Sequence, residues 1–114
     1  MTPADAAKYF FQGAMSVWLG APDFKGSPAT RSLNEWFDAS LRENLPLIAR
    51  KRGAEAYIDT LRDKVEEAYQ RYASGDLEAG RQSMVELLDL IHTHLHLPNK
   101  TQISDLIEES KQQE

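Results

Sequence analysis

The chain of 114 residues contains no cysteine. It can therefore form no disulfide, no zinc–thiolate site and no iron–sulfur cluster, and it has no thiol nucleophile. Long apolar runs are also missing, because no stretch approaches the roughly eighteen residues that a membrane-spanning helix requires. The first residues show no basic region ahead of an apolar core, which a secretory signal would have. We expect a cytoplasmic protein with no membrane partner.

Strand patterns are equally scarce, whereas apolar residues recur at helical spacing along most of the chain. Prolines and glycines are few, and nearly all of them fall where a helix would begin or end. The sequence therefore predicts an all-α fold, a small bundle of four main helices plus a short C-terminal helix. An irregular orthogonal array of the same helices is the alternative. We expect residues 1–97 to form the bundle domain and residues 98–114 to form the short helix and a tail.

The helix boundaries follow from local signals. Thr2 and Pro3 are typical of a helix start, and Gly20 of its end, while the proline- and glycine-rich stretch 20–32 predicts a loop. A second helix begins near Ser32 and either kinks or restarts at Pro46, because proline lacks the N–H group that the helix needs. Helices are also predicted over 54–73 and 77–96. The short connection between those two requires them to lie antiparallel.

The net charge of −5 is unevenly distributed. Residues 31–53 carry five basic and three acidic side chains, which gives +2, whereas residues 54–97 carry nine acidic and four basic ones, which gives −5. Residues 98–114 add a further −2, from four acids and two lysines. Negative charge repels nucleic-acid phosphates, so we do not expect nucleic acid to be the main partner. It would suit a protein partner with a basic surface.

The stretch "LIHTHLHLPN" holds all three histidines of the chain. On a continuous helix His92 and His96 lie one turn apart on the same flank, with Asp89 one turn before His92. Two imidazoles and a carboxylate could bind a divalent metal and leave one position open. The chain lacks a second element with such ligands, and histidines in a last helical turn also suit the negative end of the helix dipole. We therefore predict no cofactor and keep a metal site as the alternative.

Two helices are more apolar than one side of a small bundle requires. In "YFFQGAMSVWLG" the polar strip is narrow, and Gly13 and Ala14 would permit close helix approach. The helix over 77–96 has a second apolar side in addition to its core stripe. Such helices are either central in the bundle or carry an interface. The predicted interface residues are Phe10, Phe11, Met15 and Trp18 in the first helix and Leu87, Leu90, His94 and Leu97 in the last.

Other polar groups carry weaker signals. Arg42 and the "RKR" cluster at 50–52 could bind phosphate, but cations at a helix end more often interact with its carbonyl groups. Glu66 and Glu67 are adjacent, so their side chains diverge by about 100° and do not converge as acid and base. Serines such as Ser83 lack the surroundings of a known nucleophile motif. We therefore predict a protein that is not an enzyme.

Taken together, these features predict a non-catalytic protein–protein interaction module. It would act as an inhibitor, modulator or adaptor, in the manner of phage-type inhibitors, antitoxins or immunity proteins, or it would form a homodimer. This prediction rests on the class of small acidic helical proteins and not on individual residues. The alternative is a metal-binding helical protein, a sensor or a metal-dependent enzyme, that uses Asp89, His92 and His96.

Overall fold

The computed structural model describes residues 1–21 and 32–97, and all regular elements in these two ranges are helical. The predicted short C-terminal helix, in the segment 98–114, lies outside the described residues. The elements in chain order are α1 (Pro3–Gly20), α2 (Leu33–Ser40), the 3₁₀ turn η1 (Arg42–Asn44), α3 (Leu45–Ile48), the 3₁₀ turn η2 (Ala54–Ala56), α4 (Ile58–Ala73) and α5 (Leu77–Leu95).

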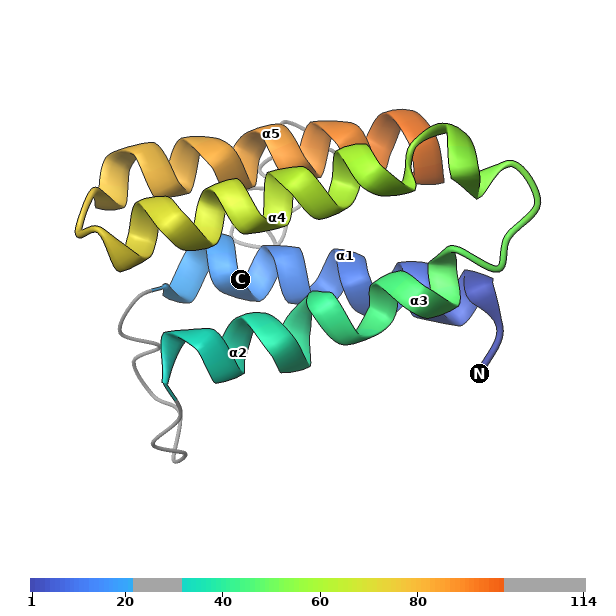
Figure 1. Cartoon of the computed structure of the whole chain (residues 1–114), viewed down its shortest axis with the longest axis horizontal. Coiled ribbons are helices and arrows are strands. Elements are labelled where there is room, and N and C mark those ends of the chain that lie inside the picture. The colour runs from blue at the N-terminus through green and yellow to red at the C-terminus, as the bar shows by residue number, and fades with distance from the viewer. Residues whose placement is uncertain (22–31, 98–114) are drawn as a thin grey trace, which may run out of the picture.

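The helices form a four-armed bundle in which the chain direction alternates from one arm to the next (Figure 1). The arms are α1, the broken arm α2–η1–α3, α4 and α5. Arms that follow one another in sequence pack together, and α5 also packs beside α1, so the four arms close into a ring. The predicted helical bundle is confirmed, and the alternative of an orthogonal array is not.

The helix starts depend on side-chain caps. The backbone N–H of Asp5 donates to Thr2 Oγ1 at 3.1 Å, and that of Glu35 donates to Ser32 Oγ at 3.1 Å. Asp76 Oδ1 accepts from the N–H of Ala79 at 3.1 Å and caps α5. Each cap satisfies a backbone donor that has no partner inside the helix, which typically contributes about 1 kcal/mol. The predicted starts near residues 2, 32 and 76 are confirmed.

The second arm is interrupted rather than bent. Helix α2 ends at Ser40, and Leu41 leaves the helical conformation with φ −126° and ψ −63°. The chain then passes through η1 and restarts as α3, with Pro46 in its first turn. Proline is tolerated there because the first N–H groups of a helix have no partner within it. Of the two outcomes predicted for Pro46, the restart is the one observed.

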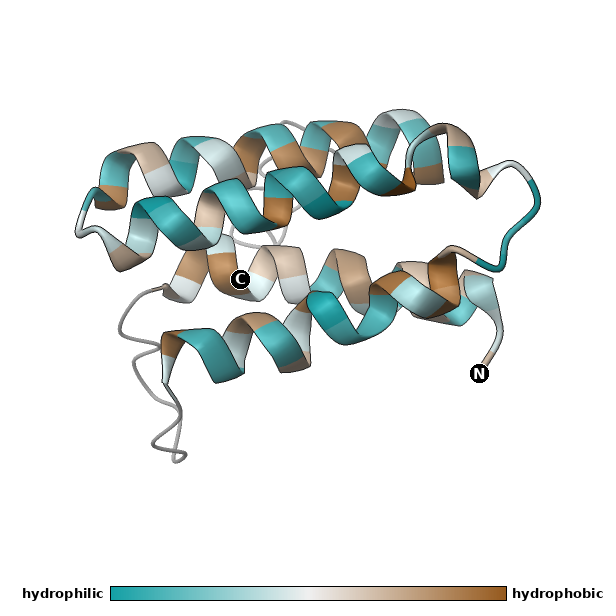
Figure 2. Ribbon diagram, viewed as in Figure 1, coloured by the Kyte–Doolittle hydropathy of each residue, from teal (hydrophilic) through white to brown (hydrophobic). Residues whose placement is uncertain are grey.

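The core lies between the four arms and takes residues from all of them. Figure 2 shows that α1 carries few strongly hydrophilic positions, whereas α4 is hydrophilic over much of its length. The difference arises because α1 contacts α2, α3 and α5, so most of its surface faces protein. The large side chains that are fully buried include Phe10, Val17, Phe37, Leu41, Ile48, Leu61, Val65, Met84, Leu87, Leu88 and Ile91.

Gly13 allows α1 and α2 to approach closely. A methyl group built on Gly13 would lie 1.9 Å from the carbonyl oxygen of Ser40, the last residue of α2. That oxygen belongs to the backbone and also accepts a hydrogen bond from Asn44 Nδ2 at 3.2 Å, so it cannot move aside freely. The predicted role of Gly13 in close helix approach is confirmed.

Among the described residues, none of the helices combines the length and the apolar character needed to cross a membrane.

Replacing Gly13 by alanine should destabilise the bundle. In an exposed helix, glycine to alanine gains about 1 kcal/mol from helix propensity, but here the overlap with Ser40 should outweigh this gain and leave a net loss of about 1–3 kcal/mol. Urea denaturation of the purified variant would measure the loss. Ser16→Ala, at an exposed position of the same helix, is the matched control and should change stability by less than about 0.5 kcal/mol. A Gly13→Ala variant as stable as the control would contradict the close contact.

Candidate functional site

The three histidines do not assemble into a metal site. Helix α5 ends at Leu95, and the N–H of His96 still donates to the carbonyl oxygen of His92 at 3.1 Å. The backbone of His96 is left-handed, with φ 60°, so its side chain does not project as it would from a continuing helix. His92 Nδ1 lies 2.8 Å from the carbonyl oxygen of Leu97 and forms a hydrogen bond with it. In residues 1–21 and 32–97, no three histidine or acidic side chains are grouped so that they could hold a metal ion. The structure thus does not group Asp89, His92 and His96, the set kept as the alternative to a protein without metal, and α5 ends at Leu95, before His96.

The second apolar side of α5 is largely covered by α4. Leu87 is completely buried, and the ring of His94 stacks on the ring of Tyr57, with centroids 4.9 Å apart and an angle of 14° between the planes. Leu90 is half-buried against the core. Leu87 was predicted at an interface but belongs to the core, because α5 has α1 on one side and α4 on the other.

The predicted interface residues of α1 also include both buried and partly exposed side chains. Phe10 has no exposed surface, so its assignment to an interface is also corrected. Its burial contributes to folding, by about 1.5–3 kcal/mol for a side chain of this kind, and leaves no surface for a partner. Phe11, Met15 and Trp18 are half-buried and pack along the edge of the core. These three keep their place as interface candidates.

Trp18 lies in a surface hollow where the end of α1 meets the beginning of α5. The hollow has a volume of about 490 Å³, and Leu77 and Val85 of α5 complete its apolar lining. Glu78, Arg81 and Gln82 form its polar edge. We call these six residues the Trp18 hollow. The side chain of Leu77 is 44% exposed, although its position on the helical wheel predicts a core residue. Leu77 lies in the first turn of α5, at the end of the bundle, where neighbouring helices do not surround it and its side chain stays exposed.

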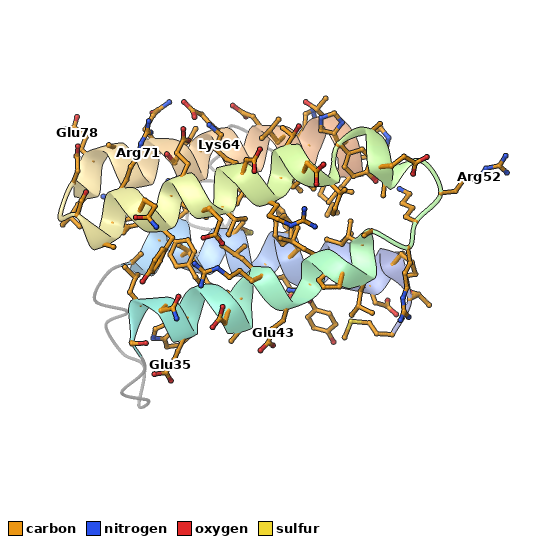
Figure 3. All side chains as sticks on the ribbon, viewed as in Figure 1. Glu35, Glu43, Arg52, Lys64, Arg71 and Glu78 are labelled. Atoms are coloured by element: carbon orange, nitrogen blue, oxygen red, sulfur yellow. The ribbon has the colours of Figure 1, made fainter. Side chains whose placement is uncertain are left out.

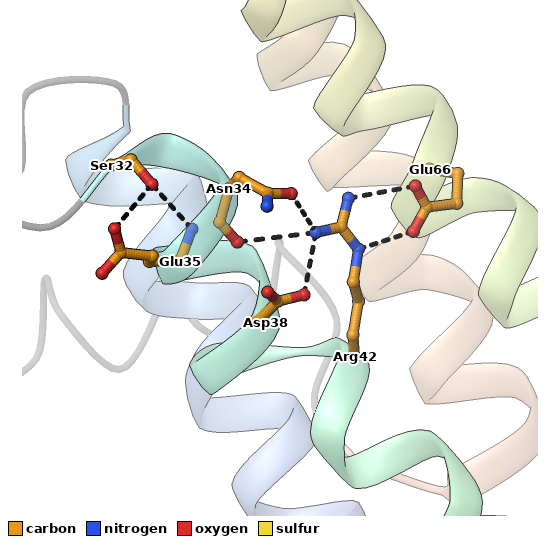
Figure 4. A network of polar contacts seen from close by, with 6 residues as sticks. All are labelled: Ser32, Asn34, Glu35, Asp38, Arg42 and Glu66. Atoms are coloured by element: carbon orange, nitrogen blue, oxygen red, sulfur yellow. Dashed lines mark hydrogen bonds and ion pairs between the residues drawn. The ribbon is translucent and has the colours of Figure 1, made fainter.

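Arg42 connects the second arm to α4. Its guanidinium donates to both carboxylate oxygens of Glu66, from Nε at 2.6 Å and from Nη2 at 3.0 Å (Figure 4). Nη1 donates to Asp38 Oδ1 at 2.9 Å and to Asn34 Oδ1 at 2.6 Å. The hydrogen bond to Glu66 is the largest reason that the pKa of Arg42 lies above its ordinary value. With these partners occupied, Arg42 is not available as a phosphate ligand.

The guanidinium of Arg42 also lies on aromatic rings. Its central carbon is 4.7 Å from the ring centroid of Tyr69 and 5.9 Å from that of Phe37. Phe37 in turn meets Tyr69 edge to face, with centroids 5.4 Å apart. Planar guanidinium groups favour such faces, which explains why arginine rather than lysine stands here. The sequence contains both Arg42 and Glu66, but it does not show that these residues, 24 positions apart, form an ion pair.

A second polar network joins α4 to α5. Lys64 Nζ donates to Glu67 Oε2 and to Glu86 Oε2, each at 2.7 Å. The hydroxyl of Ser83 donates to Glu67 Oε2 at 3.1 Å and accepts from Arg71 Nη1 at 2.7 Å. Figure 3 shows Lys64 and Arg71 along the edge where α4 and α5 run side by side. The buried hydroxyl of Ser83 is therefore satisfied by charged partners.

This network shifts the pKa of its members. Burial lowers the pKa of Lys64, but the hydrogen bonds to Glu67 and Glu86 outweigh it and leave the pKa above its ordinary value. The hydrogen bond from Lys64 is the largest cause that lowers the pKa of both Glu67 and Glu86. Glu66 and Glu67 thus face different arms, and they bind α2–η1 and α5 instead of acting as an acid–base pair.

The basic cluster at 50–52 is exposed. Arg52 extends away from the ribbon at the end of the bundle where α3 leads into α4 (Figure 3). Gly53 follows with φ 89° and stands directly before η2, not at the end of α3, which is at Ile48. This cluster places three positive charges close together at one end of the bundle.

Two buried hydroxyl groups should respond oppositely to removal. Tyr72 is 4% exposed, and its hydroxyl oxygen has no hydrogen-bond partner among the described residues, whereas Ser83 Oγ has two charged ones. We expect Tyr72→Phe to leave the free energy of unfolding unchanged or raise it by up to about 1 kcal/mol. Ser83→Ala should lower it by about 1–2 kcal/mol, since it removes the hydrogen bonds of a buried hydroxyl to two charged partners, Glu67 and Arg71. Urea denaturation of both variants measures the contrast, and a loss of stability in Tyr72→Phe would show that its hydroxyl is paired.

The Lys64 network should weaken in acid. The folded pKa of Glu67 and Glu86 lies below the ordinary value of 4.5, so their contribution is complete above that pH and is lost as the pH falls below it. We expect Lys64→Met to cost about 1 kcal/mol at pH 7, a small figure because these carboxylates are partly exposed to solvent, and less at pH 3. Denaturation across this range tests it, with Arg52→Met as a control that should show no such trend. A cost that is the same at both pH values would contradict the network.

Comparisons with known proteins add no function to this geometry. No protein-family model, no curated protein and no solved structure matches the chain.

Proposed function

We propose that the protein is a non-catalytic protein-binding module, an inhibitor, modulator or adaptor that acts by covering a surface of another protein or of a second copy of itself. The observation that carries this proposal is the Trp18 hollow. It places a tryptophan, an exposed leucine and an arginine in one concave surface between α1 and α5. Tryptophan and arginine are enriched among the residues that dominate binding energy at protein interfaces.

The surroundings of the hollow support the same function. Leu19 follows Trp18 at the end of α1 and is 56% exposed. Glu78, Arg81 and Gln82 supply hydrogen-bond donors and acceptors beside the apolar residues of the lining. Protein interfaces combine apolar contacts with hydrogen bonds. The segment 54–97 carries a net charge of −5, which would accelerate association with a partner of basic surface.

The metal-binding alternative has lost its geometric basis, because His96 caps the helix and His92 bonds to the chain that follows. Of the basic groups that could bind the phosphates of a nucleic acid, Arg42 is held by Glu66 and Asp38, which leaves only the exposed cluster at 50–52. No second function is proposed.

A paired comparison of surface variants tests the proposed function. Leu77→Asp and Arg81→Glu change exposed residues of the hollow, and Tyr9→Ser changes an apolar residue that is 53% exposed elsewhere on α1. Capture from the native host with immobilised protein should recover a partner whose retention falls about tenfold or more in the hollow variants and not in Tyr9→Ser. If the partner is a second copy of the protein, light scattering should show a homodimer, and the hollow variants should be monomeric. A monomer that captures the same proteins with and without Leu77→Asp would refute the proposal.

A further inference from the structure

A second hollow lies at the opposite end of the bundle and is almost entirely apolar. It has a volume of about 270 Å³. Its lining comes from three arms, with Pro3, Ala4, Ala7 and Lys8 from α1, Ile48 and Lys51 from α3 and the chain after it, and Leu95 and Leu97 from the end of α5 and beyond. We call it the terminal hollow.

The end of α5 is held against this hollow. His96 adopts a left-handed conformation that turns the chain, and the hydrogen bond between His92 Nδ1 and the Leu97 carbonyl keeps the turned chain beside α5. Leu97 is itself a lining residue. The segment 98–114 therefore leaves the described structure at the edge of the hollow. Its residue Ile103 is six positions further on, within about 20 Å of chain length from Leu97.

The charges of the hollow and of this segment are complementary. Lys8 and Lys51 belong to the hollow, and Arg50 and Arg52 flank Lys51. In "TQISDLIEES" the acidic residues stand beside Ile103, Leu106 and Ile107, which recur at the spacing of one helix face. The segment thus carries three large aliphatic side chains that suit the apolar lining of the hollow and negative charge that suits Lys8 and Lys51.

We propose that the terminal hollow binds the chain's own C-terminal segment, through Ile103, Leu106 and Ile107, with the acidic residues of the segment paired to Lys8 and Lys51. The segment has an advantage over any separate partner, since its attachment at Leu97 gives it an effective concentration on the order of millimolar. This contact is independent of the Trp18 hollow, which lies at the other end of α1 and α5.

Disulfide formation tests this contact directly, because the chain contains no cysteine and any introduced pair is the only one present. Ala4→Cys places a thiol in the hollow, and Leu106→Cys places one in the segment. In the chain of 114 residues under a glutathione redox buffer, this pair should close within one chain at least tenfold faster than the matched pair Ala56→Cys and Leu106→Cys. Ala56 is exposed and precedes Tyr57, whose ring stacks on His94 near the end of α5, so it lies at the same end of the bundle but does not line the hollow.

Two changes should remove the advantage of the first pair. Replacing Ile103 and Ile107 by serine removes the apolar contact, and replacing Lys8 and Lys51 by glutamate reverses the charge while leaving the tail intact. Circular dichroism confirms that each variant is folded. Equal closure rates for the two cysteine pairs would overturn the proposal. Disulfides formed between chains would assign the hollow to a second copy, and a lipid retained in stoichiometric amount, seen by native mass spectrometry, would assign it to a small amphipathic ligand; either result would also overturn it.

Discussion

The close contact between Gly13 and the carbonyl of Ser40 is the constraint on which the rest of the arrangement depends. It brings the end of α2 against the middle of α1, and there the second arm stops being helical and restarts as η1 and α3. Because α2 ends at that level, Leu41 turns into the core and Arg42 reaches α4. A larger residue at position 13 would overlap the backbone of Ser40, so the end of α2 could not pack as closely on α1.

Two polar networks, which we call clamps and which centre on Arg42 and Lys64, connect helices that the core also holds together. Arg42 joins the second arm to α4 while its guanidinium lies on Tyr69, and Lys64 joins α4 to α5 with Ser83 buried beneath it. Both clamps lie at the border of the core, where side chains are partly shielded and charge-assisted hydrogen bonds are worth more than at an open surface. A large share of the charge on α4 therefore holds the arms in place.

The two ends of the bundle differ in chemistry. At one end α1 and α5 leave Trp18, Leu77 and Arg81 around a hollow with a polar edge. At the other, the apolar terminal hollow lies beside Lys51 and the exposed basic cluster. Antiparallel packing of α1 and α5 explains the separation, because it places the first turns of one helix beside the last turns of the other. The apolar side chains in the middle of these two helices are thus mainly buried in the core, whereas some of those near the helix ends are exposed at the surface.

The sequence by itself determined the helices and their order. Caps at Thr2, Ser32 and Asp76, the restart at Pro46 and the turn at Gly75 are local effects that act through neighbouring residues. Only the tertiary structure decided which apolar residues are core. The positions of Phe10 and Leu87 on their helices do not show whether these residues belong to the core or to an interface. Their burial depends on how many neighbouring helices surround α1 and α5. The Arg42–Glu66 pair and the Trp18 hollow bring together residues that are far apart in the chain. The expected grouping of the histidines with Asp89 is absent, because α5 ends at Leu95, before His96. Periodicity shows which side of a helix a residue occupies, but the neighbours on that side are set by the packing of the whole chain.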